Sequence, residues 1–320
     1  MKMKKIAFAL ATALACTSLA ACGNPDNKLI FNDYWEQNSL APSSSLQETL
    51  EYKVKFEEAG GLNMLNYKLS YGEGTYTTTL KSQGQGYVYT TSLSMPVSFK
   101  YGSDAAVEAT DTVETEVTFQ RAGNGLTPIS SKKKVVSHTP TQHSATSSDS
   151  CFLLFDFTVE TLYAEDGKAT SAVTYSQAEG DPIVMNSEFS YGGGKHSYLD
   201  NEQLLLALRA VSASTTSGTV KSYNVFTEAK QSVKLSFSTE ETGKEFSYKL
   251  NGQDIKTNIS YRSVNMVIDA KNPGATQTAL IATTSKPENN VHRNVMLQLV
   301  TPLSYSIGSF VYTLSSITRN

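Results

Sequence analysis

Hydrophobic and polar residues alternate along most of the chain beyond residue 50. In the clearest run, residues 87–101, seven of eight alternate positions are apolar or aromatic, while the other face carries mostly Ser, Thr and Lys. This period of two predicts a half-buried β-strand. At about 3.3 Å per residue the strand would be roughly 50 Å long, so we expect it to curl. Pro96 lacks an N–H donor and predicts an edge, bulge or bend at its position.

The segment 233–261 contains three further alternating runs. They are separated by turns at Glu241–Gly243 and at Asn251-Gly252. Asn-Gly between alternating runs is the strongest short hairpin signal, because both residues tolerate positive φ. The segment therefore predicts an antiparallel meander. The alternation changes phase after Tyr261, which predicts a bulge near Arg262.

One helix is expected, over residues 200–213. Asp200 and Gln203 have the spacing of a capping box, in which each side chain bonds the backbone N–H of the other residue. We expect Arg209 to turn either toward the sheet or toward solvent. The helix has an apolar face, and we expect this face to cover the sheet. Its residues are Leu204, Leu205, Leu208 and Val211.

Between the long strand and the helix the pattern is less regular. Residues 121–150 are mostly polar and predict one short strand near 133–137 followed by a loop. The apolar run 152–162 predicts a buried strand. The predicted fold is thus dominated by β-structure: a large curved antiparallel sheet, half-barrel-like, with one covering helix near residues 200–213.

The first 22 residues have the pattern of an export signal. Three lysines precede the apolar run Ile6–Ala15, which is shorter than the roughly 20 residues that span a bilayer. The run leads to Leu19-Ala20-Ala21-Cys22, which resembles the lipobox of bacterial lipoproteins. That resemblance implies that the Cys22 thiol carries a diacylglycerol group and that the preceding peptide is removed. The alternative is an ordinary secretory signal followed by an unrelated cysteine.

These boundaries suggest a signal peptide over residues 1–21, a flexible tether over 22–48 and an antiparallel β domain over 49–320. Two sub-domains meeting near residue 197 are the alternative organisation. We expect the mature protein to lie outside the cytoplasm, anchored by its lipid to the bacterial cell membrane. The expected partner is the membrane itself, which the protein contacts through the lipid on Cys22.

Charge and cysteine content narrow the functional classes. Removal of the three signal lysines changes the formal charge from −3 to −6, which argues against nucleic-acid binding. Cys16 leaves with the signal and Cys22 is acylated, so Cys151 has no partner for an intramolecular disulfide. We expect Cys151 to be a buried small hydrophobe.

Sequence motifs for catalysis are weak. Ser130 and Lys133 have the Ser-x-x-Lys spacing of penicillin-recognising enzymes, but no Lys-Thr-Gly partner follows. Gly192–Lys195 is similar to a phosphate-binding loop, yet Phe189 stands where the first glycine belongs. We therefore expect a protein that is not an enzyme and needs no cofactor or metal. The four histidines also lack the spacing of a metal site: His138, His143, His196 and His292.

The curled strands, the Asp200 helix ending in Leu208-Arg209 and the lipobox together resemble the half-barrel envelope lipoproteins of the LolA and LppX type. The resemblance implies a concave apolar face that holds a lipid or another hydrophobic ligand. Core packing is the alternative role of the residues on that face, and a structural or partner-binding surface module is the alternative function. The oligomeric state stays open. The candidate ligand-binding residues are Tyr87, Tyr89, Met95, Phe99 and Tyr101.

Overall fold

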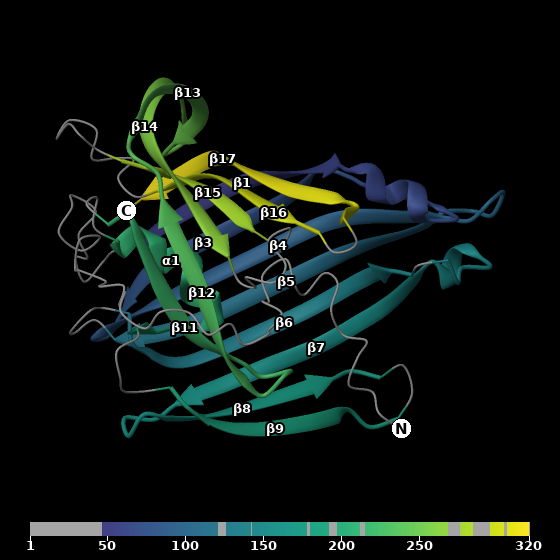
Figure 1. The fold of residues 1–320 in the computed structure, drawn as a ribbon, viewed down its shortest axis with the longest axis horizontal. Helices are drawn as coiled ribbons and strands as arrows, with labels where there is room; N and C mark the ends of the chain where they lie inside the picture. Colours follow the sequence, from purple (N-terminus) through teal and green to yellow (C-terminus); the bar gives the residue numbers. More distant parts are fainter. Residues whose placement is uncertain are drawn as a thin grey trace.

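A computed structural model describes residues 47–120, 126–141, 143–177, 180–191, 197–211, 215–267, 276–283, 295–303 and 306–319. The signal peptide, Cys22, most of the predicted tether and two of the histidines lie outside these residues. Figure 1 shows a strongly curled sheet that wraps around a short helical segment. Among the described residues, no helix has the length and apolar character needed to cross a membrane.

In the described residues, seventeen strands belong to one sheet. Those before residue 197 are β1 (Gln47–Glu58), β2 (Lys68–Tyr71), β3 (Gly74–Gln83), β4 (Gly86–Lys100), β5 (Val107–Gln120), β6 (Pro128–Pro140), β7 (Phe152–Tyr163), β8 (Lys168–Tyr175) and β9 (Ile183–Ser190). The later ones are β10 (Ser197–Tyr198), β11 (Ser217–Asn224), β12 (Ala229–Phe237), β13 (Glu241–Leu250), β14 (Gln253–Val267), β15 (Gln277–Ala282), β16 (Met296–Pro302) and β17 (Gly308–Arg319). Short helices are η3 (Gly60–Met64), η4 (Ser148–Ser150), η5 (Asn201–Gln203), α1 (Leu204–Ala207) and η6 (Leu208–Ala210).

The first and last strands pair with each other. β1 lies between β3 and β17, so the halves of the chain before and after residue 197 contribute to the same sheet. From β3 the sheet continues through β4 to β9, and from β17 it continues through β16, β15, β14 and β12 to β11. The curled antiparallel architecture expected from the alternation is confirmed.

The strand predicted over residues 87–101 is confirmed as β4. On one side of β4 the pairing ladder is interrupted at Pro96. β4 pairs with β5 without a register shift, but its other edge is shared by β3, up to Ser94, and β2, from Val97. Gly72, between β2 and β3, donates to the Pro96 carbonyl at 3.0 Å. Pro96 therefore lies where the adjoining ladder is interrupted, so its missing donor removes no ladder bond.

Two predicted elements have different lengths in the structure. The short strand near 133–137 is in fact β6, thirteen residues long, because β5 and β7 pair with it on both sides and its polar residues alternate between faces. The helix expected over 200–213 is a chain of two 3-10 turns around one α-turn, over Asn201–Ala210. Its predicted capping box between Asp200 and Gln203 is present.

The helical segment is buried on all sides rather than on one face. Leu206 and Ala207, which lie off the predicted apolar face, are as buried as the residues on it. A helix that is apolar all round belongs inside a core. The segment therefore fills the curled sheet instead of covering one side of it.

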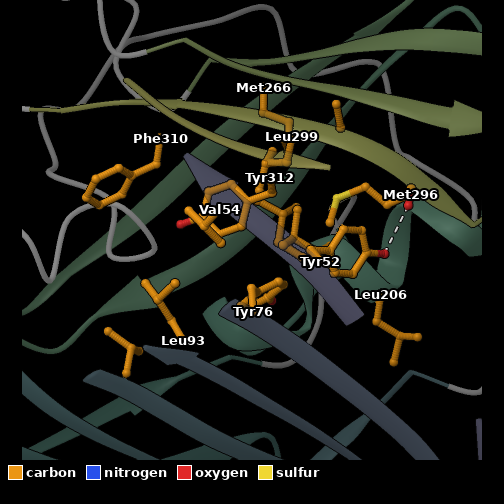
Figure 2. Packing of buried hydrophobic residues seen from close by; sticks show 14 of the residues in the cluster. Tyr52, Val54, Tyr76, Leu93, Leu206, Met266, Met296, Leu299, Phe310 and Tyr312 are labelled. Atoms are coloured by element: carbon orange, nitrogen blue, oxygen red, sulfur yellow. Dashed lines mark hydrogen bonds between the residues drawn. The ribbon is translucent and has the colours of Figure 1, made fainter. Parts of the chain in front are cut away.

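The centre of the core is rich in tyrosine. Figure 2 shows Tyr52 of β1 pointing between Met296 and Leu206, with its hydroxyl donating to the Met296 carbonyl at 3.0 Å. Tyr76 and Tyr312 meet edge to face with ring centroids 5.3 Å apart. Such aromatic contacts add to the burial energy and favour one packing arrangement.

Candidate functional site

Four of the five candidate ligand-binding residues lie along β4 and face the inside of the curled sheet, and Tyr101 directly follows the strand. Tyr87, Tyr89, Met95 and Phe99 are buried, and Tyr101 is partly buried. Tyr87 stacks on Phe119, and Phe99 packs between Tyr67 and Phe152. These neighbours occupy the space that a ligand would take, so in this structure the stripe is part of the core.

A polar cluster surrounds the start of the helical segment. Lys133 of β6 bonds Glu202 at 2.9 Å, and the Tyr163 hydroxyl donates to Asp200 at 2.6 Å. Burial raises the pKa of Glu202, although the charge of Lys133 opposes this shift. Cavities of about 20 and 40 Å³ flank Asp200–Glu202. The smaller cavity is lined in part by Ser222, whose buried hydroxyl has no hydrogen-bond partner among the described residues. These volumes suit water molecules, whereas ligand pockets measure about 300–1,000 Å³.

A second buried cluster joins both ends of the sheet to the helical segment. The Glu48 carboxylate accepts hydrogen bonds from two nitrogens of Arg209 and from Arg319 Nε at 2.8 Å. Burial alone would raise the pKa of Glu48, but the charges of Arg209 and Arg319 outweigh it and hold the pKa at about 2. Arg209 therefore turns toward the sheet, which decides between the two orientations left open by the sequence.

This cluster predicts an acid-dependent loss of stability. Because the pKa of Glu48 is lower in the folded protein than its ordinary value of 4.5, its contribution is complete above about pH 5 and is lost as pH falls toward 2. We expect the difference in free energy of unfolding between the wild type and Glu48→Gln to shrink over this range. Denaturant titrations from pH 7 to pH 2 measure it. A constant difference would contradict the ion-pair assignment.

Where β9 and β11 come together, side-chain contacts between the two strands close the curled sheet. Phe189 of β9 stacks on Tyr223 of β11 with centroids 3.8 Å apart and rings 4° from parallel. Phe226, at the turn after β11, meets Phe157 of β7 edge to face. Among the described residues, β9 forms backbone pairs with β8 alone. Within the described part of the chain, the outer edge of β9 therefore has no strand partner over the residues that precede Phe189.

The open half of this edge lies within an exposed apolar surface. β7 begins before the region that β8 covers, since β8 pairs with Phe157 and the residues after it. The starts of β7 and β9 therefore lie at the same end of the sheet. We name this surface the apolar corner; its residues and their exposed fractions are Leu153 44%, Leu154 58%, Ile183 37%, Val184 54% and Met185 42%.

Monomeric proteins rarely expose large contiguous apolar patches, and such patches commonly mark binding surfaces. The apolar corner holds five of the eight large hydrophobic residues that are exposed in the described chain. The prediction that 152–162 is a buried strand is wrong at Leu153, Leu154 and Leu162. A signal was present in Ile183-Val184-Met185, where three successive apolar residues in a strand must place side chains on both faces.

The residues of the weak catalytic motifs either lie apart from one another or have structural roles. Ser130 and Lys133 are three apart in β6 and face opposite sides of the sheet. Cys151 is fully buried, as predicted, and burial raises the pKa of its thiol. His138 donates its backbone N–H to Asp111 at 2.7 Å and has a ring nitrogen 2.8 Å from the same oxygen, which anchors the end of β6. In the described part of the chain, no group of three or more His, Cys, Asp or Glu residues is placed to hold a metal.

Comparisons with known proteins give a likeness to solved structures alone. No family model matches the chain, and no curated protein matches it. A solved structure that is similar is the β-barrel-like protein of a domain of unknown function, DUF1849, from Brucella abortus. The identity is 8% and the TM-score 0.45, with 86% of this chain and 98% of that chain covered.

Proposed function

We propose that this chain is a non-enzymatic lipoprotein of the bacterial cell envelope, tethered outside the cytoplasm by acylated Cys22, which binds an apolar extended segment of a partner protein. The observation that carries the proposal is the apolar corner on the unpaired edge of β9. The lipobox supports the tether, because small residues surround Cys22 and follow a short apolar run.

The chemistry of the edge favours a polypeptide as the ligand. An unpaired strand presents N–H and C=O groups that another extended chain satisfies. Residues 183–187 of β9 carry no charge, whereas exposed edges are commonly protected by lysine or proline within the strand. The side chains of Ile183, Val184 and Met185 then supply apolar contacts on both faces of the added strand.

The location of the corner fits an outward-facing binding surface. Successive antiparallel pairs from β1 through β3–β9 place the starts of β7 and β9 at the end of the sheet where β1 ends. Gln47, which follows the tether, begins β1 and therefore lies at the opposite end of the sheet. A lipid on the inner face of β4 is a less favoured ligand, because side chains fill that face.

Photo-crosslinking in the native envelope tests the proposal. A benzoylphenylalanine at Leu154 probes the apolar corner, and Val184→Lys places a charge on the free edge. We expect one discrete protein adduct, joined through an apolar segment, that decreases about ten-fold with Val184→Lys because a desolvated ammonium is costly. Leu162→Lys is the matched control, since Leu162 is 65% exposed on β7 but lies away from the edge. It should leave the adduct unchanged.

Three results would overturn the proposal. The adduct could have the mass of a phospholipid, which would make the corner a lipid site. It could form equally in the Val184→Lys protein, which would exclude the β9 edge. No adduct at Leu154 would mean that the corner has no partner in the envelope.

A further inference from the structure

Two buried carboxyl groups at the start of the helical segment share one ammonium group. Lys133 Nζ lies 2.9 Å from Glu202 Oε1, and both side chains are less than a tenth exposed. Asp200 is buried beside them, and its carboxylate accepts hydrogen bonds from the Glu202 N–H at 2.9 Å and from the Tyr163 hydroxyl at 2.6 Å. Burial and the charge of Asp200 raise the pKa of Tyr163 well above its ordinary range, so this phenol is neutral.

The cluster therefore has one negative charge that its single ammonium group does not balance. An unbalanced charge away from water is costly. Burial raises the pKa of Glu202, and the charge of Asp200 adds to the rise while that of Lys133 opposes it. A proton on Glu202 or a bound cation would remove the excess charge. The groups around the cluster distinguish these two species.

A cavity of the size of one monatomic ion adjoins the two carboxyl groups. Its volume is about 20 Å³, and about 10–15 Å³ is enough for one water-sized sphere. Oxygen atoms are the ligands that hard cations such as Na⁺ and Ca²⁺ prefer. Every polar residue that lines the cavity has a side-chain oxygen: Tyr76, Thr91, Asp200, Asn201, Glu202, Ser222 and Gln277.

Unpaired polar atoms lie beside the same cavity. The hydroxyl of Ser222, which is 4% exposed, has no hydrogen-bond partner among the described residues. Gln231 is its neighbour across β11 and β12, is 3% exposed, and has neither amide atom paired within the described chain. Buried polar groups are nearly always paired. A proton on Glu202 would balance the charge without bonding Ser222, and a water molecule would bond Ser222 without balancing the charge. A cation does both.

We infer that the cavity bounded by Asp200, Glu202 and Ser222 binds one hard metal cation, Na⁺ or Ca²⁺, through oxygen atoms. The site has two carboxyl groups, fewer than the clusters of three that are absent from the described residues, because neutral oxygen atoms supply the other ligands. The ion joins the helical segment to β11 and, through the pair of Glu202 with Lys133, to β6. It thereby holds the curled sheet together near the contact of β9 with β11. This inference does not depend on the partner proposed above.

Thermal unfolding of the purified full chain tests the inference. After treatment with a chelator, the melting temperature is measured by circular dichroism in choline chloride, sodium chloride and calcium chloride of equal ionic strength. We expect it to be about 5 °C higher with the bound cation than in choline chloride, because a ligand of the folded state alone raises its stability. A rise in sodium chloride identifies Na⁺, and a rise at much lower concentrations of calcium identifies Ca²⁺.

Ser222→Ala tests the location of the ion, since it keeps every charge and removes one oxygen ligand. It should require about ten-fold more cation for the same rise in melting temperature. Ser236→Ala, on the exposed face of the neighbouring strand β12, is the matched control and should respond as the wild type does. Equal melting temperatures in the three salts would overturn the inference. An equal response of the wild type and Ser222→Ala would also overturn it, because the cation would then bind elsewhere.

Discussion

Glu48→Gln should lower the free energy of unfolding by about 3–5 kcal/mol at pH 7, the usual cost of removing one partner from a buried ion pair. Glu48 is 3% exposed and its carboxylate is shared by Arg209 and Arg319. The substitution removes the negative charge that balances these two buried guanidinium groups. Because β1, η6 and β17 meet at this point, the effect should appear as global unfolding in a denaturant titration followed by circular dichroism.

Glu51→Gln is the matched control for this substitution. Glu51 is exposed on the same strand, three residues away, so its replacement should change the free energy of unfolding by no more than about 0.5 kcal/mol. Equal effects of the two substitutions would mean that the Glu48 cluster contributes nothing specific to stability.

Phe99→Ala should also cost about 3–5 kcal/mol of unfolding free energy, because it leaves a cavity in a packed core. Phe99 has no exposed surface, and its ring lies 4.8 Å from that of Phe152 and 6.3 Å from that of Tyr67. Chemical denaturation measures the loss. The experiment separates the two roles that the sequence allows for the aromatic stripe, since the walls of a ligand pocket tolerate truncation better than a filled core does.

Ser92→Ala on the exposed face of β4 controls for changes in strand propensity and should remain within about 0.5 kcal/mol of the wild type. If Phe99→Ala were as stable as Ser92→Ala, space would have to exist around Phe99. The aromatic stripe would then again be a candidate ligand-binding surface.

The sequence predicts the strands better than their ends and partners. Alternation predicted the strands β4, β12, β13 and β14 because side chains on successive residues face opposite sides of a strand. The predicted meander is wrong in one pairing, since β12 pairs with the end of β14 and β13 pairs with its start. It underestimated β6, since Lys133 and Thr139 face inward and make the pattern appear polar. Lys133 is tolerated inside because Glu202, 69 residues later in the chain, neutralises it. No local pattern contains that information.

The candidate binding surface was harder to foresee for a related reason. An apolar residue at a sheet edge and one in a core look alike in sequence, and only the strand order distinguishes them. Leu154 and Phe157 belong to one apolar run, yet Leu154 is 58% exposed and Phe157 is 2% exposed. The difference arises because Leu154 and Phe157 are three residues apart in β7 and face opposite sides of the sheet, Phe157 toward the core and Leu154 away from it. The stripe on β4 became core because the rings of Phe119, Tyr67 and Phe152 pack against it, and the strand's own sequence does not show these contacts.

The most direct test of the account is amide hydrogen exchange in β9, measured on the protein in its native envelope membranes and on the purified full chain. A partner strand would satisfy the free edge, so we expect amides within Ile183–Asn186 to exchange rapidly in the purified protein and to be protected in the envelope. The amides of β4, which pair on both sides, should be equally protected in both samples. Equal exchange of the β9 amides in the two samples would contradict the proposal that this edge binds a partner.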